Sequence, residues 1–185
     1  MKSYVILLRG INVGGKNKVP MAALKLCLEA LGFTNVSTYI ASGNVILESD
    51  EERKDIKARI ERALLKNFKL DSELIKVLVL SQSQLEKVIN NKPKGFGEQP
   101  DTYYSDAIFL IDIDSAQAMS VFNPRDGVDK VWPGNGVIYS QRLSALRTKS
   151  RLSTIMGTPA YKSMTIRSWN TATQLLALLR ARHAK

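Results

Sequence analysis

The order of apolar runs and amphipathic patterns in residues 1–80 constrains the fold most. Residues 4–8 form a continuous apolar run, which predicts a buried strand. After a glycine-containing loop, Pro20 is suited to a first helical position, and the apolar side chains that follow recur at helical spacing up to Gly32. The chain therefore opens with a strand, a loop and an amphipathic helix.

Two strands, a helix and a further strand complete this first pattern. The strands over 36–40 and 45–47 are joined by a turn at Gly43, and Ser49 with Glu52 resembles a capping box that opens the next helix. An apolar run over 75–80 predicts the last strand. The resulting βαββαβ order is typical of ferredoxin-like folds.

The second half repeats this pattern in part. We predict a short helix capped by Ser81 and Gln84, a linker over 90–102, and then the order βαββα. The elements of that order are a strand over 104–111, a helix over 115–122, strands over 130–132 and 137–139, and helices over 143–156 and from Trp169 onward. Gly134-Asn135 repeats the Gly43-Asn44 turn, which indicates an internal structural duplication.

The predicted fold class is therefore α+β, with two ferredoxin-like βαββα-type halves. The predicted divisions are a first half over 1–80, a helix and linker over 81–102, and a second half with basic C-terminal helices over 103–185.

Composition places the chain among soluble cytoplasmic proteins. Hydrophobic residues make up 44% of the 185 residues, and no apolar stretch approaches the roughly 18 residues that a membrane helix needs. Cys27 is the only cysteine, which excludes an internal disulfide and favours a reducing compartment.

The net charge of +10 is concentrated at the C-terminal end. Residues 130–185 carry ten lysines and arginines and no acid, while the acids gather in residues 42–129. Such asymmetry favours an anionic partner, namely nucleic acid, a phosphorylated ligand or an acidic surface. The alternative is a basic face that pairs with the acidic middle segment.

Residues 10–17 nearly match a nucleotide-binding P-loop. Asn17 stands where a hydroxyl would bind magnesium, and Pro20 delays the helix, so we reject an NTPase loop. A weaker prediction survives, in which the amides of Gly14 and Gly15 form an anion-binding nest flanked by cations. These cations are Arg9, Lys16 and Lys18. The alternative is a polar loop with solvated lysines.

The second basic segment spans residues 147–170. Arg147 and Arg151 lie four apart on the predicted helix, and Lys162 and Arg167 precede a final helix that Ser168 caps. Nearby aromatic rings could stack on bases, although Trp169 also suits the core. We hypothesise that this segment and the glycine loop converge on one anion-binding groove.

The sequence offers no recognisable catalytic constellation. His183 is the only histidine and lies near the C-terminus, so neither a nucleophile–histidine pair nor a histidine metal site is predicted. Asp112 and Asp114 suit a strand end and a helix cap better than acid–base catalysis. Catalytic residues stay unassigned, and we predict no metal and no cofactor.

Four segments resemble a bacterial family, domain of unknown function family 1697. They are Leu8 to Met21, Tyr39 to Val45, Ser150 to Leu152 and Thr165 to Thr171. Ser168 stands where the family usually has asparagine. The resemblance implies a soluble α+β protein without established activity or cofactor. Because the signature segments coincide with the basic ones, it suggests a shared surface of Arg9, Asn12, Lys16, Arg151, Arg167 and Asn170.

These observations predict an anion-binding module for nucleic acid or another polyanion. A small-molecule site or enzyme for a phosphorylated or nucleotide ligand is the alternative, and a protein-interaction role is a third. The sequence does not decide the oligomeric state, and it predicts no membrane partner.

Overall fold

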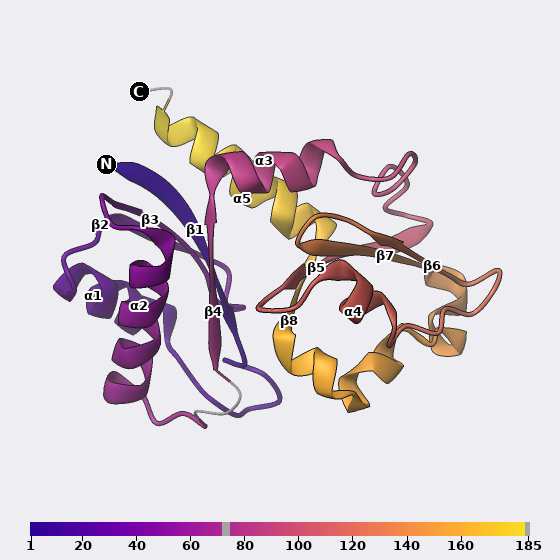
Figure 1. Ribbon diagram of the computed structural model, residues 1–185, viewed down its shortest axis with the longest axis horizontal. Coiled ribbons are helices and arrows are strands. Elements are labelled where there is room, and N and C mark those ends of the chain that lie inside the picture. Colours follow the sequence, from indigo (N-terminus) through magenta and orange to yellow (C-terminus); the bar gives the residue numbers. More distant parts are fainter. Residues whose placement is uncertain (72–74, 184–185) are drawn as a thin grey trace. The chain divides into compact units, whose positions relative to one another are not determined.

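A computed structural model describes residues 1–71 and 75–183, so Lys185, one of the ten C-terminal cations, lies outside the described residues. Two compact units divide the chain: Met1–Leu85 together with Leu175–Lys185, and Glu86–Gln174. The boundaries predicted from the sequence, at residues 80 and 102, stay predictions. Figure 1 labels the helices and strands of both units.

The first unit contains a four-stranded antiparallel sheet with strand order β2-β3-β1-β4. Its elements follow the predicted order: β1 (Lys2–Arg9), α1 (Met21–Ala30), β2 (Thr34–Tyr39), β3 (Asn44–Ser49), α2 (Arg53–Asn67) and β4 (Lys76–Ser81). The helix α3 (Gln82–Asn90) follows directly. Its predicted cap is confirmed, because the Ser81 hydroxyl accepts from the Gln84 N–H and the Gln84 side chain accepts from the Ser81 N–H.

Alternation along the strands explains how the core of this unit forms. Every second residue of β1, namely Tyr4, Ile6 and Leu8, joins a buried cluster with apolar residues of α1 and α2, because strand side chains alternate between faces. Figure 1 shows both helices on one side of this sheet. At the other end of the chain, α5 (Trp169–His183) places Arg182 against β2, where it donates to the Asn35 carbonyl and to the Ser37 hydroxyl.

The second unit contains another four-stranded antiparallel sheet, with order β6-β7-β5-β8. Its elements are β5 (Tyr103–Leu110), α4 (Ser115–Met119), β6 (Asp129–Pro133), β7 (Val137–Leu143), the 3₁₀ helices η1 (Ser144–Lys149), η2 (Leu152–Gly157) and η3 (Pro159–Ser163), and β8 (Met164–Ser168). The mixed α+β class is thus confirmed. The predicted βαββα order missed β8, which is only five residues long.

The two faces of the second sheet carry different cores. One face packs Ile108, Ile138 and Met164 against α4 and η2. The other holds an aromatic cluster in which the Phe96 ring meets Trp132, Tyr139 and Trp169 edge-on, with centroids 5.0–5.9 Å apart. The buried Tyr139 hydroxyl donates to the Val88 carbonyl at 2.7 Å, and burial raises its pKa to about 12. Trp169 is therefore a core residue.

Phe96 lies in the segment that we predicted to be a linker. Its side chain is fully buried, although residues 90–102 are rich in proline and glycine. The same segment contains Gly95 and Gly97, both with positive φ, so its glycines supply the turns that bring Phe96 into the aromatic cluster.

Two local predictions are wrong. The helix predicted over 143–156 is instead two 3₁₀ helices separated by extended backbone at Ser150. The Ser49 capping box does not form: α2 begins at Arg53 after Glu52, and the Ser49 hydroxyl accepts from the Glu51 N–H instead. By contrast, Asp114 caps α4 in a complete capping box with Gln117.

None of the helices in residues 1–71 and 75–183 combines the length and the apolar character that a membrane span requires.

Candidate functional site

The glycine loop forms a tight two-residue turn. Gly14 and Gly15 have φ of +56° and +76°, and the Lys16 N–H donates to the Val13 carbonyl at 3.0 Å. Positive φ at both central positions is the geometry of a type I′ turn, which glycine adopts without strain. Both glycines are exposed, and a side chain at either would meet no other atom.

Two asparagines hold this loop in shape. The Asn12 amide nitrogen donates to the Val19 and Ala41 carbonyls, and its oxygen accepts from the Val19 N–H, all at 2.8–2.9 Å. The Asn17 amide likewise joins the Gly10 carbonyl to the Asp71 N–H. Because both N–H donors of Asn12 are already used, its side chain organises the loop, and Asn17 does the same where a P-loop has its metal-binding hydroxyl.

The three loop cations differ in exposure. Arg9 is buried at the end of β1, opposite Lys76 of β4. Lys16 and Lys18 are exposed, and neither forms an ion pair with any residue the structure describes. The exposed lysines can therefore reach an anion in solvent, whereas Arg9 belongs to the interior.

The 3₁₀ segment of the second unit carries four exposed cations, which we call the basic η surface: Arg147, Lys149, Arg151 and Lys162. None of the four forms an ion pair within residues 1–71 and 75–183. No ion pair in the described residues therefore supports the alternative, in which acids of the middle segment pair with these cations.

Asp129 fixes the backbone beneath this surface. Its Oδ2 accepts from the backbone N–H groups of Arg125 at 3.0 Å and Arg151 at 2.8 Å. Burial opposes the charge on Asp129, but these hydrogen bonds, the Ser150 hydroxyl and the charge of Arg142 together lower its pKa. The carboxylate thus binds the Arg151 backbone and leaves the guanidinium of Arg151 exposed.

Arg167 and Asn170 occupy different environments. Arg167 in β8 is 6% exposed; its Nη1 donates to the Thr165 hydroxyl and the Ile166 carbonyl, and burial lowers its pKa to about 10. Asn170 is exposed in the first turn of α5, where Ser168 caps the helix as predicted by accepting from the Thr171 N–H. Arg167 is therefore held inside, and Asn170 can reach solvent.

The sequence-predicted residues lie in both units. The glycine loop belongs to the first unit and residues 147–170 to the second. Within the second unit, Arg147 lies on η1, Arg151 at the junction before η2, and Lys162 on η3. The common groove stays a prediction.

A family model described as "Protein of unknown function (DUF1697)" matches residues 1–139. The chain belongs to this family. Its structure is similar to that of the conserved bacterial protein SP0830 from Streptococcus pneumoniae, with 26% sequence identity and a TM-score of 0.81. The match covers 96% of this chain and 98% of that chain. A search of curated proteins found no match.

Sequence reasoning missed a charged group on the second sheet. Arg142 of β7 lies opposite both Tyr104 of β5 and Asp129 of β6, with its guanidinium 5.7 Å from the Tyr104 ring centroid. Asp106 follows on the same face of β5. Burial raises the pKa of Asp106, and Arg142 partly opposes that rise. An acidic residue in the middle of the predicted strand β5 was the available signal.

Proposed function

We propose that this protein binds nucleic acid or another polyanion through the basic η surface. The observation that carries the proposal is the exposure of four cations without a partner carboxylate in the described chain: two on η1, one at the junction before η2 and one on η3. A polyanion would supply the missing counter-charge at several points, and the release of its condensed counterions would favour binding.

The glycine loop supports this proposal through Lys16 and Lys18 in particular. Both are exposed beside a hydrogen-bonded turn, so they can contact phosphates with little loss of backbone freedom. In this proposal three residues near the contacts have structural roles: Arg9, Asn12 and Arg167. Asn170 donates a hydrogen bond to the polyanion from the first turn of α5.

Charge reversal of two exposed arginines tests the proposal. A labelled single-stranded RNA and a DNA duplex are titrated by fluorescence anisotropy at several salt concentrations. In Arg147→Glu/Arg151→Glu, we expect weaker binding and a salt slope reduced by about 0.7 per lost contact for the single strand. Arg167 is unsuitable for this test because its side chain is buried.

The matched control is Lys54→Glu/Lys69→Glu. It makes the same change in net charge at two exposed lysines of the first unit, outside the basic η surface. We expect the control to keep most of the affinity. Equal losses of affinity in both double variants would show that the effect comes from net charge alone. No binding by the wild-type protein at low salt would exclude polyanion binding.

We also propose that the two units arose by duplication of a ferredoxin-like unit. In both, the first strand of the unit lies between the third and fourth strands, and the second strand lies at the edge next to the third. The single cysteine fits the cytoplasm as the compartment in which nucleic acid would be met.

A further inference from the structure

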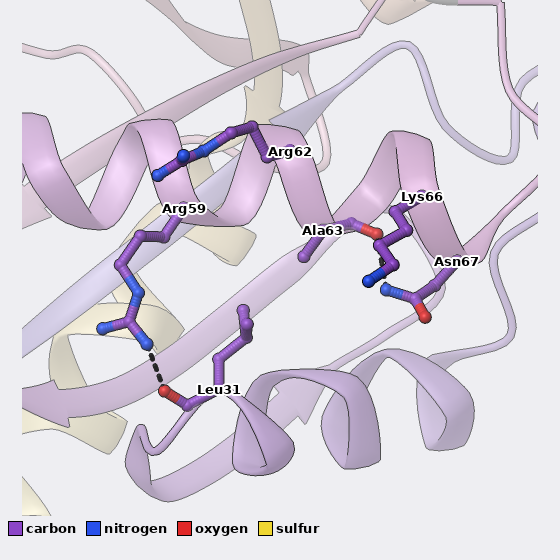
Figure 2. Close-up of a pocket in the computed structure, with 6 residues that line it drawn as sticks. All are labelled: Leu31, Arg59, Arg62, Ala63, Lys66 and Asn67. Carbon is purple, nitrogen blue, oxygen red and sulfur yellow. Dashed lines mark hydrogen bonds between the residues drawn. The ribbon is translucent and has the colours of Figure 1, made fainter.

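A pocket of about 330 Å³ opens in the first unit between α2 and the end of α1. Its lining residues are Leu31, Arg59, Arg62, Ala63, Lys66 and Asn67. Figure 2 shows Arg59 reaching from α2 to Leu31, with Lys66 and Asn67 about two turns farther along the helix. The volume lies at the small end of the range for ligand sites.

One of the three cations in this pocket is already neutralised. The Arg59 guanidinium donates to the Glu51 carboxylate and to the Leu31 carbonyl, and it lies 4.9 Å from the Phe33 ring centroid. It therefore satisfies a carbonyl at the negative end of α1 and forms one fixed wall of the pocket.

The other two cations keep free donors. Arg62 lies along α2 with Nε bonded to the Ala58 carbonyl, which leaves its two terminal nitrogens available. The Lys66 ammonium has no hydrogen bond or ion pair with any described residue. Asn67 uses one amide N–H on the Ala63 carbonyl and retains the other.

We propose that this pocket binds a small phosphate monoester. The uncompensated charges of Arg62 and Lys66 match the charge of about −2 that a phosphate monoester carries at neutral pH. An arginine fork, an ammonium and an amide N–H offer donors to several phosphate oxygens. Leu31 and the buried Ala63 provide an apolar wall on which the organic part of the ligand packs.

This proposal is independent of polyanion binding, since it concerns other residues in the other unit. Phenyl phosphate is a suitable probe, because its ring tests the apolar wall and its phosphate tests the cations. We expect ¹H–¹⁵N spectra of the full chain to show shifts at residues 31 and 59–67 on titration. Shifts centred on the basic η surface instead would overturn the proposal.

Arg62→Gln/Lys66→Gln tests the two cations, and both side chains are exposed, so the fold should persist. We expect the dissociation constant for phenyl phosphate to rise at least about tenfold, as for loss of charged hydrogen bonds. Lys54→Gln/Lys69→Gln is the control and should bind as the wild type does. Equal affinity of the two double variants would contradict the site.

Inorganic phosphate and benzyl alcohol separate the two parts of the ligand. Inorganic phosphate should bind more weakly than phenyl phosphate, since it cannot use Leu31 and Ala63, and benzyl alcohol should not bind. Absence of phenyl phosphate binding at about 10 mM, where a site of millimolar affinity would be mostly filled, would also overturn the proposal.

Discussion

The carboxylate of Asp129 accepts a hydrogen bond from the backbone N–H of Arg151, 22 residues later in the chain, at 2.8 Å. The same oxygen accepts from the Arg125 N–H at 3.0 Å. One side chain at the start of β6 thus binds the backbone of both the loop before it and the junction between η1 and η2. The position of the basic η surface depends on this junction.

Loss of this carboxylate should destabilise the protein. We expect Asp129→Ala to lower the free energy of unfolding by about 2–3 kcal/mol, because two backbone N–H groups lose their acceptor. Asp129→Asn keeps one acceptor oxygen and should cost less. Urea denaturation measures both values, and an alanine variant as stable as the wild type would contradict this assignment.

The lowered pKa of Asp129 adds a pH dependence. A carboxyl group whose pKa is lower in the folded state stabilises the fold above the unfolded value, near 3.8, and loses that effect as pH falls through the folded pKa. The difference in stability between wild type and Asp129→Asn should therefore be present at pH 7 and shrink toward pH 3. A constant difference would exclude the charge as its cause.

Asp106 should behave in the opposite way. Burial raises its pKa, so the folded state binds the proton more tightly, and stability rises as pH falls through the folded pKa. We expect Asp106→Asn to stabilise the protein at pH 7 and to lose this advantage in mild acid. The control is Asp101→Asn at an exposed position, which should change stability little; equal effects at both sites would rule out burial as the cause.

Local periodicity was sufficient to predict most of the first unit. The continuous apolar run of β1 and the helical spacing of α2 each depend on neighbours in sequence, and both elements lie close to the predicted residues. The predicted helix over 143–156 failed because the Asp129 carboxylate, distant in sequence, binds the Arg151 N–H and so favours a break at Ser150. The spacing of residues in the sequence does not predict that contact.

The candidate site was predicted in part, because residue type gives charge but not exposure. The concentration of cations from residue 130 onward is visible in the sequence, and Arg147, Arg151 and Lys162 are exposed. Burial of Arg9 and Arg167 follows from their places in strands of the two sheets. The sequence did not predict the pocket beside α2, because Arg62 and Lys66 have the pattern of an ordinary solvated helix face. Only the folded structure shows that the end of α1 lies beside them.

Ile40 is a β-branched residue in left-handed backbone geometry. It has φ of +48° and is 52% exposed, in the turn between β2 and β3. Ile40→Asn should raise the free energy of unfolding by about 1 kcal/mol, because asparagine tolerates this conformation better. The control is Val13→Asn, an exposed β-branched residue without positive φ, which should give no gain in thermal denaturation. Equal gains at both positions would contradict the role of φ.

Gly97 supports the aromatic cluster by having no side chain. An added Cβ would lie 2.3 Å from Cδ1 and 2.5 Å from Nε1 of Trp169, and Gly97 has φ of +73°. Gly97→Ala should therefore cost about 3–5 kcal/mol, the sum of backbone strain and displacement of a packed indole. Gly95→Ala separates the two causes: its φ is +80° but nothing lies within 4 Å of its Cβ, so strain alone should cost about 1–2 kcal/mol. Tryptophan emission during urea denaturation measures the free energy of unfolding of both variants. Equal losses would show that Trp169 can move aside. The cluster of Phe96, Tyr139 and Trp169 would then be less rigid than its packing indicates.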